Sequence, residues 1–307
     1  MAIALIIQEA RMRQAWVNAF NEFSNQLDLR TWPELGDIND IDFAVTWRPP
    51  EGLLASLPNL KAIHSVGAGI NYILEDKQLP NVPILRVVDE RLKLDMAQFV
   101  SHAVLDHYIK MPLYRKAQLE KNWNPSRPLD IKTVGVLGIG EIGTYTAKTL
   151  QQLQFNVIGF SRSPKKDLPF ETFHGVQGFE TFLNMSDVLI CLVPLTEATT
   201  GILNKTTFSK LPKNAYLINV GRGRHLIEAD LIPAIESGQL SGAALDVFVD
   251  EPLPSDHPFW THPAISITPH ISSQTVPSRV VSLIMDNYQR LQSGKPLLNQ
   301  VDLQRGY

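Results

Sequence analysis

The chain has 307 residues, of which 44% are hydrophobic and 19% charged, and its formal net charge is −3. This composition is enough for one large or two medium-sized cores. The slight acidic excess argues against nucleic acid or an anionic membrane surface as a partner, because both favour basic proteins, and small-molecule chemistry is the better expectation.

The first 97 residues alternate short apolar runs with polar or amphipathic stretches. We expect strands in "IALII", "LDLRT", "DFAVTW", "KAIHSV" and "PILRVV". This alternation is typical of a parallel α/β domain. The first run is too short to span a bilayer and lacks a basic n-region and a small-residue cleavage site, so we predict no membrane segment.

Residues 94–119 have apolar side chains at mostly helical spacing, which predicts one helix crossing between two domains. A second α/β series follows from Lys132, and residues 276–294 form a last amphipathic helix that we expect to return to the first domain. The predicted organisation is therefore a domain of residues 1–97 and 275–307 with a second domain, residues 98–274, inserted into it.

The one cysteine, Cys191, lies in the apolar run "DVLICLVP". We expect a buried thiol that behaves as a small hydrophobic side chain, and a single cysteine excludes an intramolecular disulfide. A reducing, cytoplasmic location fits this cysteine usage.

The stretch "TVGVLGIGEIG" places Gly138, Gly140 and Gly143 between a predicted strand and a predicted helix. In a dinucleotide-binding turn the first glycine permits the tight turn, the second lets the pyrophosphate approach, and the third allows close helix–strand packing. Because the motif stands in that context and another strand-like run follows, we predict a dinucleotide cofactor rather than a merely structural turn.

The next strand-like run, "FNVIGF", ends in "SRSPKK" rather than in the acidic residue that binds the ribose of NAD. The hydroxyls of Ser161 and Ser163, the guanidinium of Arg162 and the ammonium of Lys165 or Lys166 suit an additional phosphate. The alternative is a solvated polar turn of ordinary loop composition. We predict NADPH as the cofactor, with NADH as the weaker alternative.

Three further segments end strands with residues suited to 2-oxo acid chemistry. Arg222 in "NVGRGRH" can bind a carboxylate with its two-pronged guanidinium, and the adjacent glycines leave the approach open. "LDVFVDEP" supplies Asp246 and Glu251, and "TPH" supplies His270. A histidine oriented by a carboxylate is a proton donor near neutral pH. Each residue alone is more often structural, but together they suit the reduction of a 2-oxo acid.

The ordered set of these motifs resembles the D-isomer-specific 2-hydroxyacid dehydrogenase family over the whole chain, including "VGAG" at 66–69 and the terminal "VDLQRGY". "TWRPP", "SRS" and that terminus are most similar to its glyoxylate/hydroxypyruvate reductase A branch. The resemblance implies a Rossmann cofactor domain inserted into a flavodoxin-like substrate domain, both doubly wound parallel sheets, and a homodimer formed through the cofactor domain.

The same resemblance implies roles for individual residues. Arg222 binds the carboxylate and carbonyl of a small 2-oxo acid, Glu251 pairs with His270, and His270 protonates the carbonyl oxygen. The backbone of Gly67, Ala68 and Gly69 donates amides to the carboxylate, and Trp47 lines the substrate pocket, although a lone tryptophan after a strand is by default a core residue. The cofactor-binding set that we expect consists of Gly138, Gly140, Glu141, Ile142, Gly143, Ser161, Arg162, Ser163, Lys165, Pro194, Thr199, Val220, Arg222, Asp246, His270 and Ser272.

One position departs from the family pattern, because "DMAQ" places Gln98 where a glutamate is frequent. We assign Gln98 no catalytic part. The remaining histidines show no metal-ligand spacing, and hydride transfer needs no metal, so we predict no metal site. They are His64, His102, His107, His174, His225, His257 and His262.

Together these features predict hydride transfer to a 2-oxo acid held in a cleft that domain closure shields from water. An NAD-dependent D-2-hydroxyacid or phosphoglycerate-type dehydrogenase is one alternative, and it predicts an acidic residue near position 161. A formate dehydrogenase is disfavoured because that branch has glutamine in place of Glu251. A nucleotide-sensing corepressor that retains the catalytic residues is the alternative from another class. The sequence leaves open the choice among glyoxylate, hydroxypyruvate and bulkier 2-oxo acids.

Overall fold

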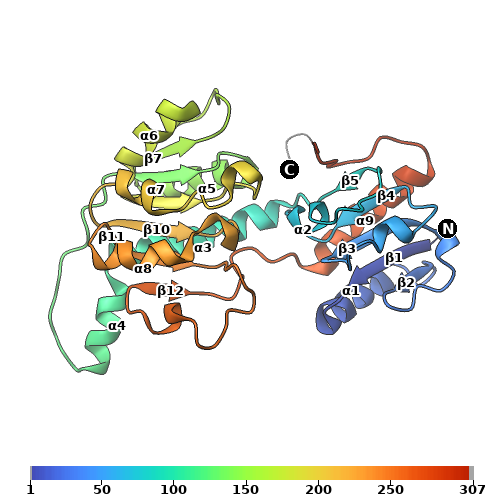
Figure 1. Ribbon diagram of the computed structural model, residues 1–307, viewed down its shortest axis with the longest axis horizontal. Helices are drawn as coiled ribbons and strands as arrows, with labels where there is room; N and C mark the ends of the chain where they lie inside the picture. The colour runs from blue at the N-terminus through green and yellow to red at the C-terminus, as the bar shows by residue number, and fades with distance from the viewer. Residues whose placement is uncertain (1, 304–307) are drawn as a thin grey trace. The chain divides into compact units, whose positions relative to one another are not determined.

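The computed structural model describes residues 2–303, which fall into two compact units. Unit 1 contains the chain up to Asp89 and again from Gln274, and unit 2 is Glu90–Ser273. Unit 2 is thus inserted into unit 1 (Figure 1). The first boundary between the units falls after Asp89, earlier than the predicted boundary at residue 97, because the helix that begins at Glu90 belongs wholly to unit 2. The last four residues of the terminal "VDLQRGY" lie outside the described part of the chain.

The described residues of unit 1 form a five-stranded parallel sheet in the order β2-β1-β3-β4-β5. Its strands are β1 (Ala2–Ile7), β2 (Leu29–Thr31), β3 (Ile41–Trp47), β4 (Ala62–Ser65) and β5 (Ile84–Leu85). Its helices are α1 (Ala10–Phe23), α2 (Asn71–Leu74) and α9 (Pro277–Gln292), with short 3₁₀ turns η1 (Ile38–Asp40) and η2 (Leu54–Ser56). Every residue of β1 is buried, as expected for a central parallel strand covered on both faces. This is a flavodoxin-like strand order, as the family resemblance implied for the substrate domain.

The described residues of unit 2 form a seven-stranded parallel sheet in the order β12-β11-β10-β9-β6-β7-β8. Its strands are β6 (Val134–Leu137), β7 (Val157–Phe160), β8 (Glu171–Phe173), β9 (Val188–Cys191), β10 (Ala215–Asn219), β11 (Leu240–Leu245) and β12 (Ile265–Ile267). Its helices are α3 (Glu90–Tyr108), α4 (Met111–Leu119), α5 (Glu141–Gln152), α6 (Gly175–Met185), α7 (Lys205–Lys210) and α8 (Glu228–Glu236), with η3 (Glu197–Thr199), η4 (Gly223–His225) and η5 (Pro258–Thr261). The strand order reverses beside β6, which confirms the predicted Rossmann arrangement.

The predicted single helix over 94–119 is wrong, because α3 ends at Tyr108 and α4 begins at Met111. Lys110 between them has a left-handed backbone (φ 61°), which an α-helix does not accommodate. Pro112 then lies in the first turn of α4, where its missing N–H costs no helical hydrogen bond.

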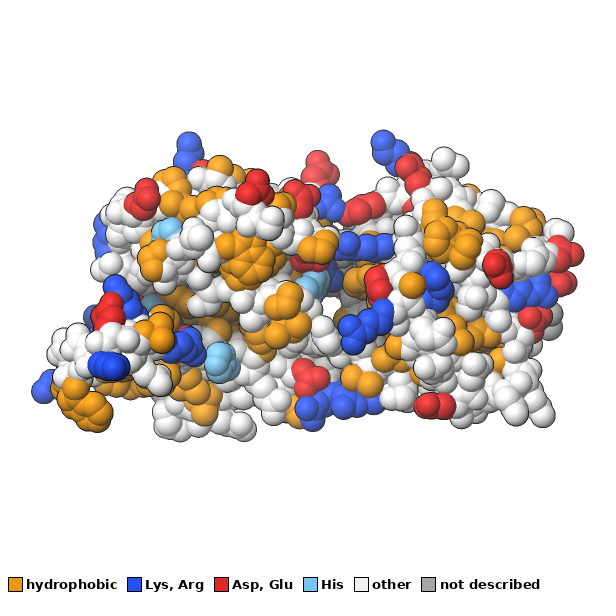
Figure 2. Space-filling model, turned by 90° about the horizontal axis from the view of Figure 1, so that it is seen from below, with side chains coloured by type: hydrophobic (Ala, Val, Ile, Leu, Met, Phe, Trp, Pro, Cys, Tyr) orange, Lys and Arg blue, Asp and Glu red, His pale blue; other side chains and the backbone are white. Residues whose placement is uncertain are grey.

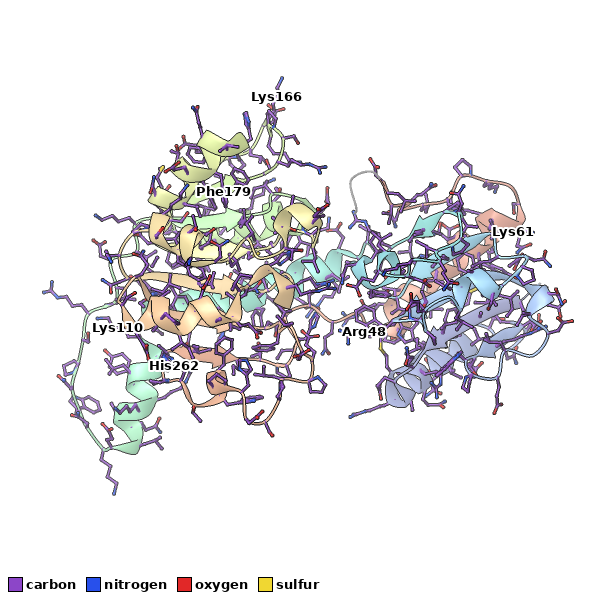
Figure 3. All side chains as sticks on the ribbon, viewed as in Figure 1. Arg48, Lys61, Lys110, Lys166, Phe179 and His262 are labelled. Atoms are coloured by element: carbon purple, nitrogen blue, oxygen red, sulfur yellow. The ribbon has the colours of Figure 1, made fainter. Side chains whose placement is uncertain are left out.

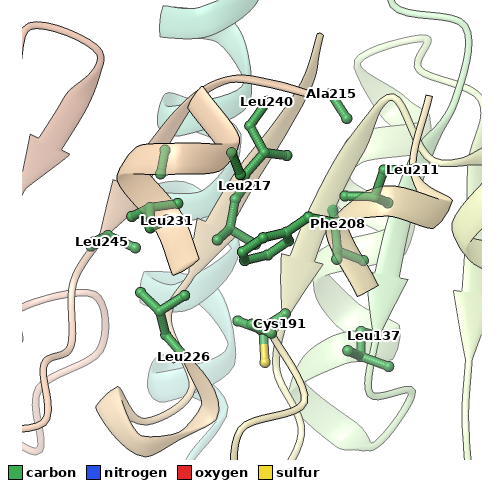
Figure 4. Close-up of a cluster of buried hydrophobic side chains, with 14 of the residues drawn as sticks. Leu137, Cys191, Phe208, Leu211, Ala215, Leu217, Leu226, Leu231, Leu240 and Leu245 are labelled. Atoms are coloured by element: carbon green, nitrogen blue, oxygen red, sulfur yellow. The ribbon is translucent and has the colours of Figure 1, made fainter. Parts of the chain in front are cut away.

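Cys191 lies in one of two apolar clusters that cover the faces of the unit 2 sheet (Figure 4). Phe208 and Leu217 belong to the same cluster, and the thiol is a free, fully buried group, as predicted. Burial raises the pKa of the Cys191 thiol to about 12, so it stays protonated at neutral pH.

Charged side chains of both signs are mixed over the described surface that Figure 2 presents, with Lys and Arg lying near Asp and Glu on each unit. This distribution agrees with the formal net charge of −3. Among the described helices, none combines the length and the apolar character needed to cross a membrane.

Candidate active site

The residues of unit 2 that were predicted to bind cofactor or substrate lie in segments that follow the carboxyl ends of its strands. Gly138 follows β6, Ser161 follows β7, Pro194 comes shortly after β9, Arg222 after β10, Asp246 after β11 and His270 after β12. Because all of these strands run parallel, their carboxyl ends share one edge of the sheet. Ligands of open α/β sheets bind at this edge, where the strand order reverses.

The glycine turn after β6 has the three features that a dinucleotide site requires. Gly138 has φ +113°, and a Cβ there would lie 2.7 Å from the carbonyl carbon of Leu192. A Cβ on Gly143 would lie within 1.9 Å of the Gly138 oxygen, which shows how closely α5 approaches β6. A Cβ on Gly140, in contrast, would meet no described atom within 4 Å. The turn is therefore tight at its ends and open in its middle, where a pyrophosphate approaches.

The amino end of α5 begins directly at this turn. Glu141 and Ile142 are its first residues, so their backbone N–H groups lie among those that have no acceptor within the helix. Such a helix end attracts anionic groups. The Glu141 carboxylate lies 3.0 Å from Lys93 Nζ, so the side chain is held by a cation on α3 while the backbone forms the helix end.

The loop after β7 carries the residues predicted to recognise the additional phosphate. Arg162, Ser163 and Lys165 are exposed, and Lys166 lies at the outer end of this loop (Figure 3). Ser161 is buried, and its hydroxyl donates to the Ser163 carbonyl at 2.7 Å. The Ser161 proton is thus used inside the turn, and contact of Ser161 or Ser163 with the phosphate stays a prediction.

The turn after β10 holds Arg222 at the carboxyl edge of the sheet. Buried Asn219 accepts from the Gly221 N–H at 3.3 Å and donates from Nδ2 to the Arg222 carbonyl at 3.1 Å. The Arg222 guanidinium donates from Nη1 to the Gly221 carbonyl at 2.6 Å. A Cβ on Gly223 would lie 1.8 Å from the carbonyl carbon of Phe248. The arginine turn thus packs directly on the segment that leads to the candidate catalytic glutamate.

His270 and Glu251 form the pair that the sequence predicted. His270 Nδ1 lies 3.1 Å from Glu251 Oε1 and 3.0 Å from Oε2. The Phe248 N–H donates to Glu251 Oε1 at 3.2 Å, which fixes the carboxylate beside the ring. The histidine side chain is 33% exposed and the glutamate 21% exposed. Because Nδ1 faces the carboxylate, Nε2 is the ring nitrogen left to pass a proton to a ligand.

The backbone of His270 is in the left-handed region (φ 55°), and Asp246 holds it there. The Asp246 carbonyl accepts from the His270 N–H at 2.9 Å. Its carboxylate accepts from the Thr268 hydroxyl at 2.6 Å, the Ile271 N–H at 2.9 Å and the Ser272 N–H at 2.8 Å. Asp246 is fully buried, so it acts here by organising the histidine loop. A contact from Asp246 or Ser272 to the cofactor stays a prediction.

Two other predicted cofactor residues lie on one loop. The Thr199 hydroxyl donates to the Pro194 carbonyl at 2.7 Å and accepts from the Thr196 N–H at 2.8 Å, which ties η3 to the end of β9. Val220 is buried beside the arginine turn. Gln98 lies exposed in the middle of α3, and the structure adds no role for it.

In unit 1, Trp47 ends β3 and contacts the "VGAG" loop. Its ring lies 4.4 Å from that of Tyr72, centre to centre, and a Cβ on Gly67 would lie 3.3 Å from Trp47 Cζ3. Tyr72 donates from its hydroxyl to the Thr46 carbonyl at 3.0 Å. Trp47 is half-buried rather than a core residue, which leaves part of its surface for a ligand.

Ser65 fixes the backbone of the same loop. Its Oγ accepts from the Gly67 N–H at 3.0 Å and lies 2.6 Å from the Tyr72 hydroxyl. The Gly67 amide is thus engaged by Ser65, and donation from the amides of Gly67, Ala68 and Gly69 to a substrate carboxylate stays a prediction.

Sequence reasoning missed four residues that build these turns: Ser65, Tyr72, Asn219 and His225. Asn219 and His225 stand three residues to either side of Arg222, a spacing that lets polar side chains close a turn. That spacing was the available signal. Ser65 bonds to the Gly67 N–H two residues on, which is also a local spacing, whereas Tyr72 carried no such signal because it donates to Thr46 on β3.

Comparison with known proteins places this geometry in a family. Residues 101–272 match the family model described as D-isomer specific 2-hydroxyacid dehydrogenase, NAD binding domain. A protein of Photorhabdus laumondii named glyoxylate/hydroxypyruvate reductase A is 40% identical over 300 residues, 95% of this chain and 96% of that protein. Two crystal structures are similar over the full chain. A D-isomer specific 2-hydroxyacid dehydrogenase from Xanthobacter autotrophicus Py2, in complex with NADPH and MES, has a TM-score of 0.92, 36% identity and full coverage of both chains. An NADPH-dependent glyoxylate/hydroxypyruvate reductase from Sinorhizobium meliloti, in complex with NADP and sulfate, has a TM-score of 0.92, 31% identity and coverage of 100% of this chain and 99% of that one.

Proposed function

Because the chain belongs to the D-isomer specific 2-hydroxyacid dehydrogenase family, we propose that it reduces small 2-oxo acids, glyoxylate and hydroxypyruvate, with NADPH. The observation that carries the proposal is the His270–Glu251 pair, with Nδ1 held 3.0 Å from the carboxylate. This arrangement leaves Nε2 to protonate a carbonyl oxygen.

The residues of the site divide the chemical tasks among them. Arg222 binds the substrate carboxylate and polarises the carbonyl, because its guanidinium offers several donors in one plane. His270 donates a proton from Nε2 to the carbonyl oxygen and becomes neutral, and Glu251 orients the ring through Nδ1 and stabilises its positive charge before the transfer. When bound, NADPH supplies the hydride that reduces the carbonyl carbon. The product is the 2-hydroxy acid.

The cofactor is held by the glycine turn and by the loop after β7. The open space beside Gly140 and the amino end of α5 suit the pyrophosphate. Exposed Arg162, Ser163 and Lys165 suit the additional phosphate of NADPH. An NAD-dependent D-2-hydroxyacid dehydrogenase is less consistent with this loop, because residues 161–166 contain no acidic side chain to bind the ribose hydroxyls.

A homodimer through the cofactor domain completes the proposal. Helix α4 has no buried residue, and two apolar side chains beside its end are almost fully exposed, Leu119 at 86% and Trp123 at 96%. Surface of this kind suits a second copy of the chain. Replacing Leu119 and Trp123 with glutamate is expected to give monomers by light scattering, while a wild type that is monomeric at micromolar concentration contradicts the dimer.

The free thiol of Cys191 agrees with a cytoplasmic location, which stays a proposal.

The experiment that tests the function is a panel of 2-oxo acids assayed with both nicotinamide cofactors. We expect glyoxylate and hydroxypyruvate to be reduced with kcat/KM values at least about tenfold higher with NADPH than with NADH. Pyruvate, which lacks the hydroxyl of hydroxypyruvate, and a bulkier branched 2-oxo acid serve as comparisons. Tight NADPH binding without turnover of any 2-oxo acid favours the nucleotide-sensing alternative, and preference for NADH favours the NAD-dependent one.

A further inference from the structure

We propose that His225 is a positioning residue that holds the Arg222 turn in the conformation in which the arginine binds substrate. The proposal rests on the proposed function of Arg222 and adds a residue that the catalytic set does not include. His225 is the last residue of η4 and is fully buried.

The imidazole closes the arginine turn from inside. The Arg222 N–H donates to His225 Nδ1 at 3.0 Å, and the His225 N–H donates back to the Arg222 carbonyl at 3.1 Å. Asn219 Nδ2 also donates to that carbonyl, at 3.1 Å. The backbone N–H and the backbone carbonyl of Arg222 are therefore both hydrogen-bonded, and the acceptor for the N–H is His225 Nδ1.

Contacts on either side leave the ring little freedom to move. A Cβ on Gly221 would lie 2.8 Å from His225 Nδ1, so the missing side chain of this glycine is what lets the ring reach the Arg222 N–H. The backbone beyond the turn is held as well, because the Leu203 N–H donates to the His225 carbonyl at 2.9 Å. A turn supported in this way keeps its arginine in place before the substrate arrives.

The hydrogen bond also determines the protonation state of the ring. Nδ1 accepts from the Arg222 N–H, so its lone pair is free of a proton and the neutral ring carries its hydrogen on Nε2. The pKa of His225 is lowered to about 4, chiefly by burial and also by the Arg222 charge, while the Pro194 carbonyl acts in the opposite direction. Nδ1 therefore remains an acceptor at neutral pH.

A role in packing alone does not account for a histidine here. Nε2 is buried, and the Pro194 carbonyl acts on the ring without meeting the full geometry of a hydrogen bond. Burying such a group costs free energy, which an apolar side chain of similar size avoids. The benefit that offsets this cost is the acceptor that Nδ1 provides to the arginine turn.

Three substitutions separate positioning from packing. His225→Asn keeps an acceptor oxygen close to the place of Nδ1, His225→Gln moves the amide toward the place of Nε2, and His225→Leu keeps the bulk without any acceptor. We expect His225→Leu to raise the KM for glyoxylate at least about fivefold, since a buried N–H is left without a partner. His225→Asn should restore most of this loss and His225→Gln should not.

Positioning of Arg222 is distinguished from general structural damage by comparing the KM for glyoxylate with the Kd for NADPH. General damage would change both constants, whereas a misplaced arginine turn changes mainly the KM for glyoxylate. The Kd for NADPH, measured by fluorescence, is expected to stay within about twofold of wild type in the Asn and Gln variants. Equal KM values for glyoxylate in all folded variants overturn the proposal, as does an Asn variant as impaired as the Gln variant. If the Leu variant does not fold, the Asn and Gln variants decide the outcome. A wild type that reduces no 2-oxo acid in the same assay contradicts the proposed function, whereas an active wild type with silent substitutions contradicts only the role of His225.

Discussion

Replacing Arg162 with alanine should remove most of the preference for NADPH. The guanidinium is exposed on the loop after β7, and the Ser161 hydroxyl beside it is already bonded to the Ser163 carbonyl. Arg162 is the one arginine in residues 161–166, and a guanidinium can bind a phosphate through two parallel hydrogen bonds, which a lysine cannot. A charge-assisted hydrogen bond contributes about 1.5 to 3 kcal/mol, and exposure to solvent favours the lower end of that range. The expected loss is at least about tenfold in kcat/KM for NADPH.

The assay compares kcat/KM for NADPH and NADH at saturating glyoxylate in wild type and variant. We expect the loss to arise mainly in the KM for NADPH, with little change for NADH, because NADH lacks the phosphate. Lys166→Ala is the matched control, since it removes the same charge from the outer end of the same loop (Figure 3). A ratio of NADPH to NADH efficiency that survives Arg162→Ala unchanged refutes the reasoning. An equal loss of kcat/KM for NADPH in Lys166→Ala would show that the preference comes from the overall positive charge of the loop and not from a specific contact of Arg162.

Three further predictions concern the catalytic pair, the backbone and acid stability. Glu251→Gln replaces the carboxylate that orients His270 through Nδ1, so kcat for hydroxypyruvate should fall while the Kd for NADPH changes little, and an unchanged kcat would exclude the pairing. Gly223→Ala should lower Tm by several degrees, because its Cβ would lie 1.8 Å from the Phe248 backbone. Gly140→Ala should leave Tm unchanged but weaken NADPH binding, because its Cβ would meet no described atom within 4 Å. Equal Tm values for the two variants would contradict this prediction. Burial lowers the pKa of His64 to about 4, below the value of about 6.5 in an unfolded chain, so the unfolded state binds more protons between these values and stability should fall as pH drops from 6.5 toward 4. Urea midpoints at pH 7 and 5 should show a smaller decline for His64→Gln than for wild type, and an identical decline would rule out His64 as a contributor.

The features that the sequence predicted well are those that a local backbone requirement determines. Gly138 and Gly143 were recognisable because the turn and the helix–strand contact exclude a Cβ, and the structure places backbone atoms within 2.7 and 1.9 Å of the missing carbons. His270 and Glu251 were recognisable because each follows the end of a parallel strand, and strand order alone brings such segments to one edge.

The features that the sequence predicted poorly depend on which partner a polar group finds after folding. The partners that the Gly67 N–H and the Ser161 hydroxyl find, Ser65 Oγ and the Ser163 carbonyl, could not be predicted from the sequence. The break between α3 and α4 was missed because helical apolar spacing continues across Lys110, whose left-handed backbone interrupts the helix. His225 was set aside because its partner is a backbone N–H rather than a metal or a carboxylate.

The most direct test of 2-oxo acid reduction with His270 as proton donor is the oxidation of NADPH by hydroxypyruvate, followed in wild type and His270→Ala side by side. We predict ready turnover by the wild type and a kcat about 100 to 10,000-fold lower in the variant, with the KM for hydroxypyruvate changed little, because the variant loses the proton donor but keeps Arg222. A wild type that leaves NADPH unoxidised, or a variant with near-normal kcat at neutral pH, would contradict this assignment.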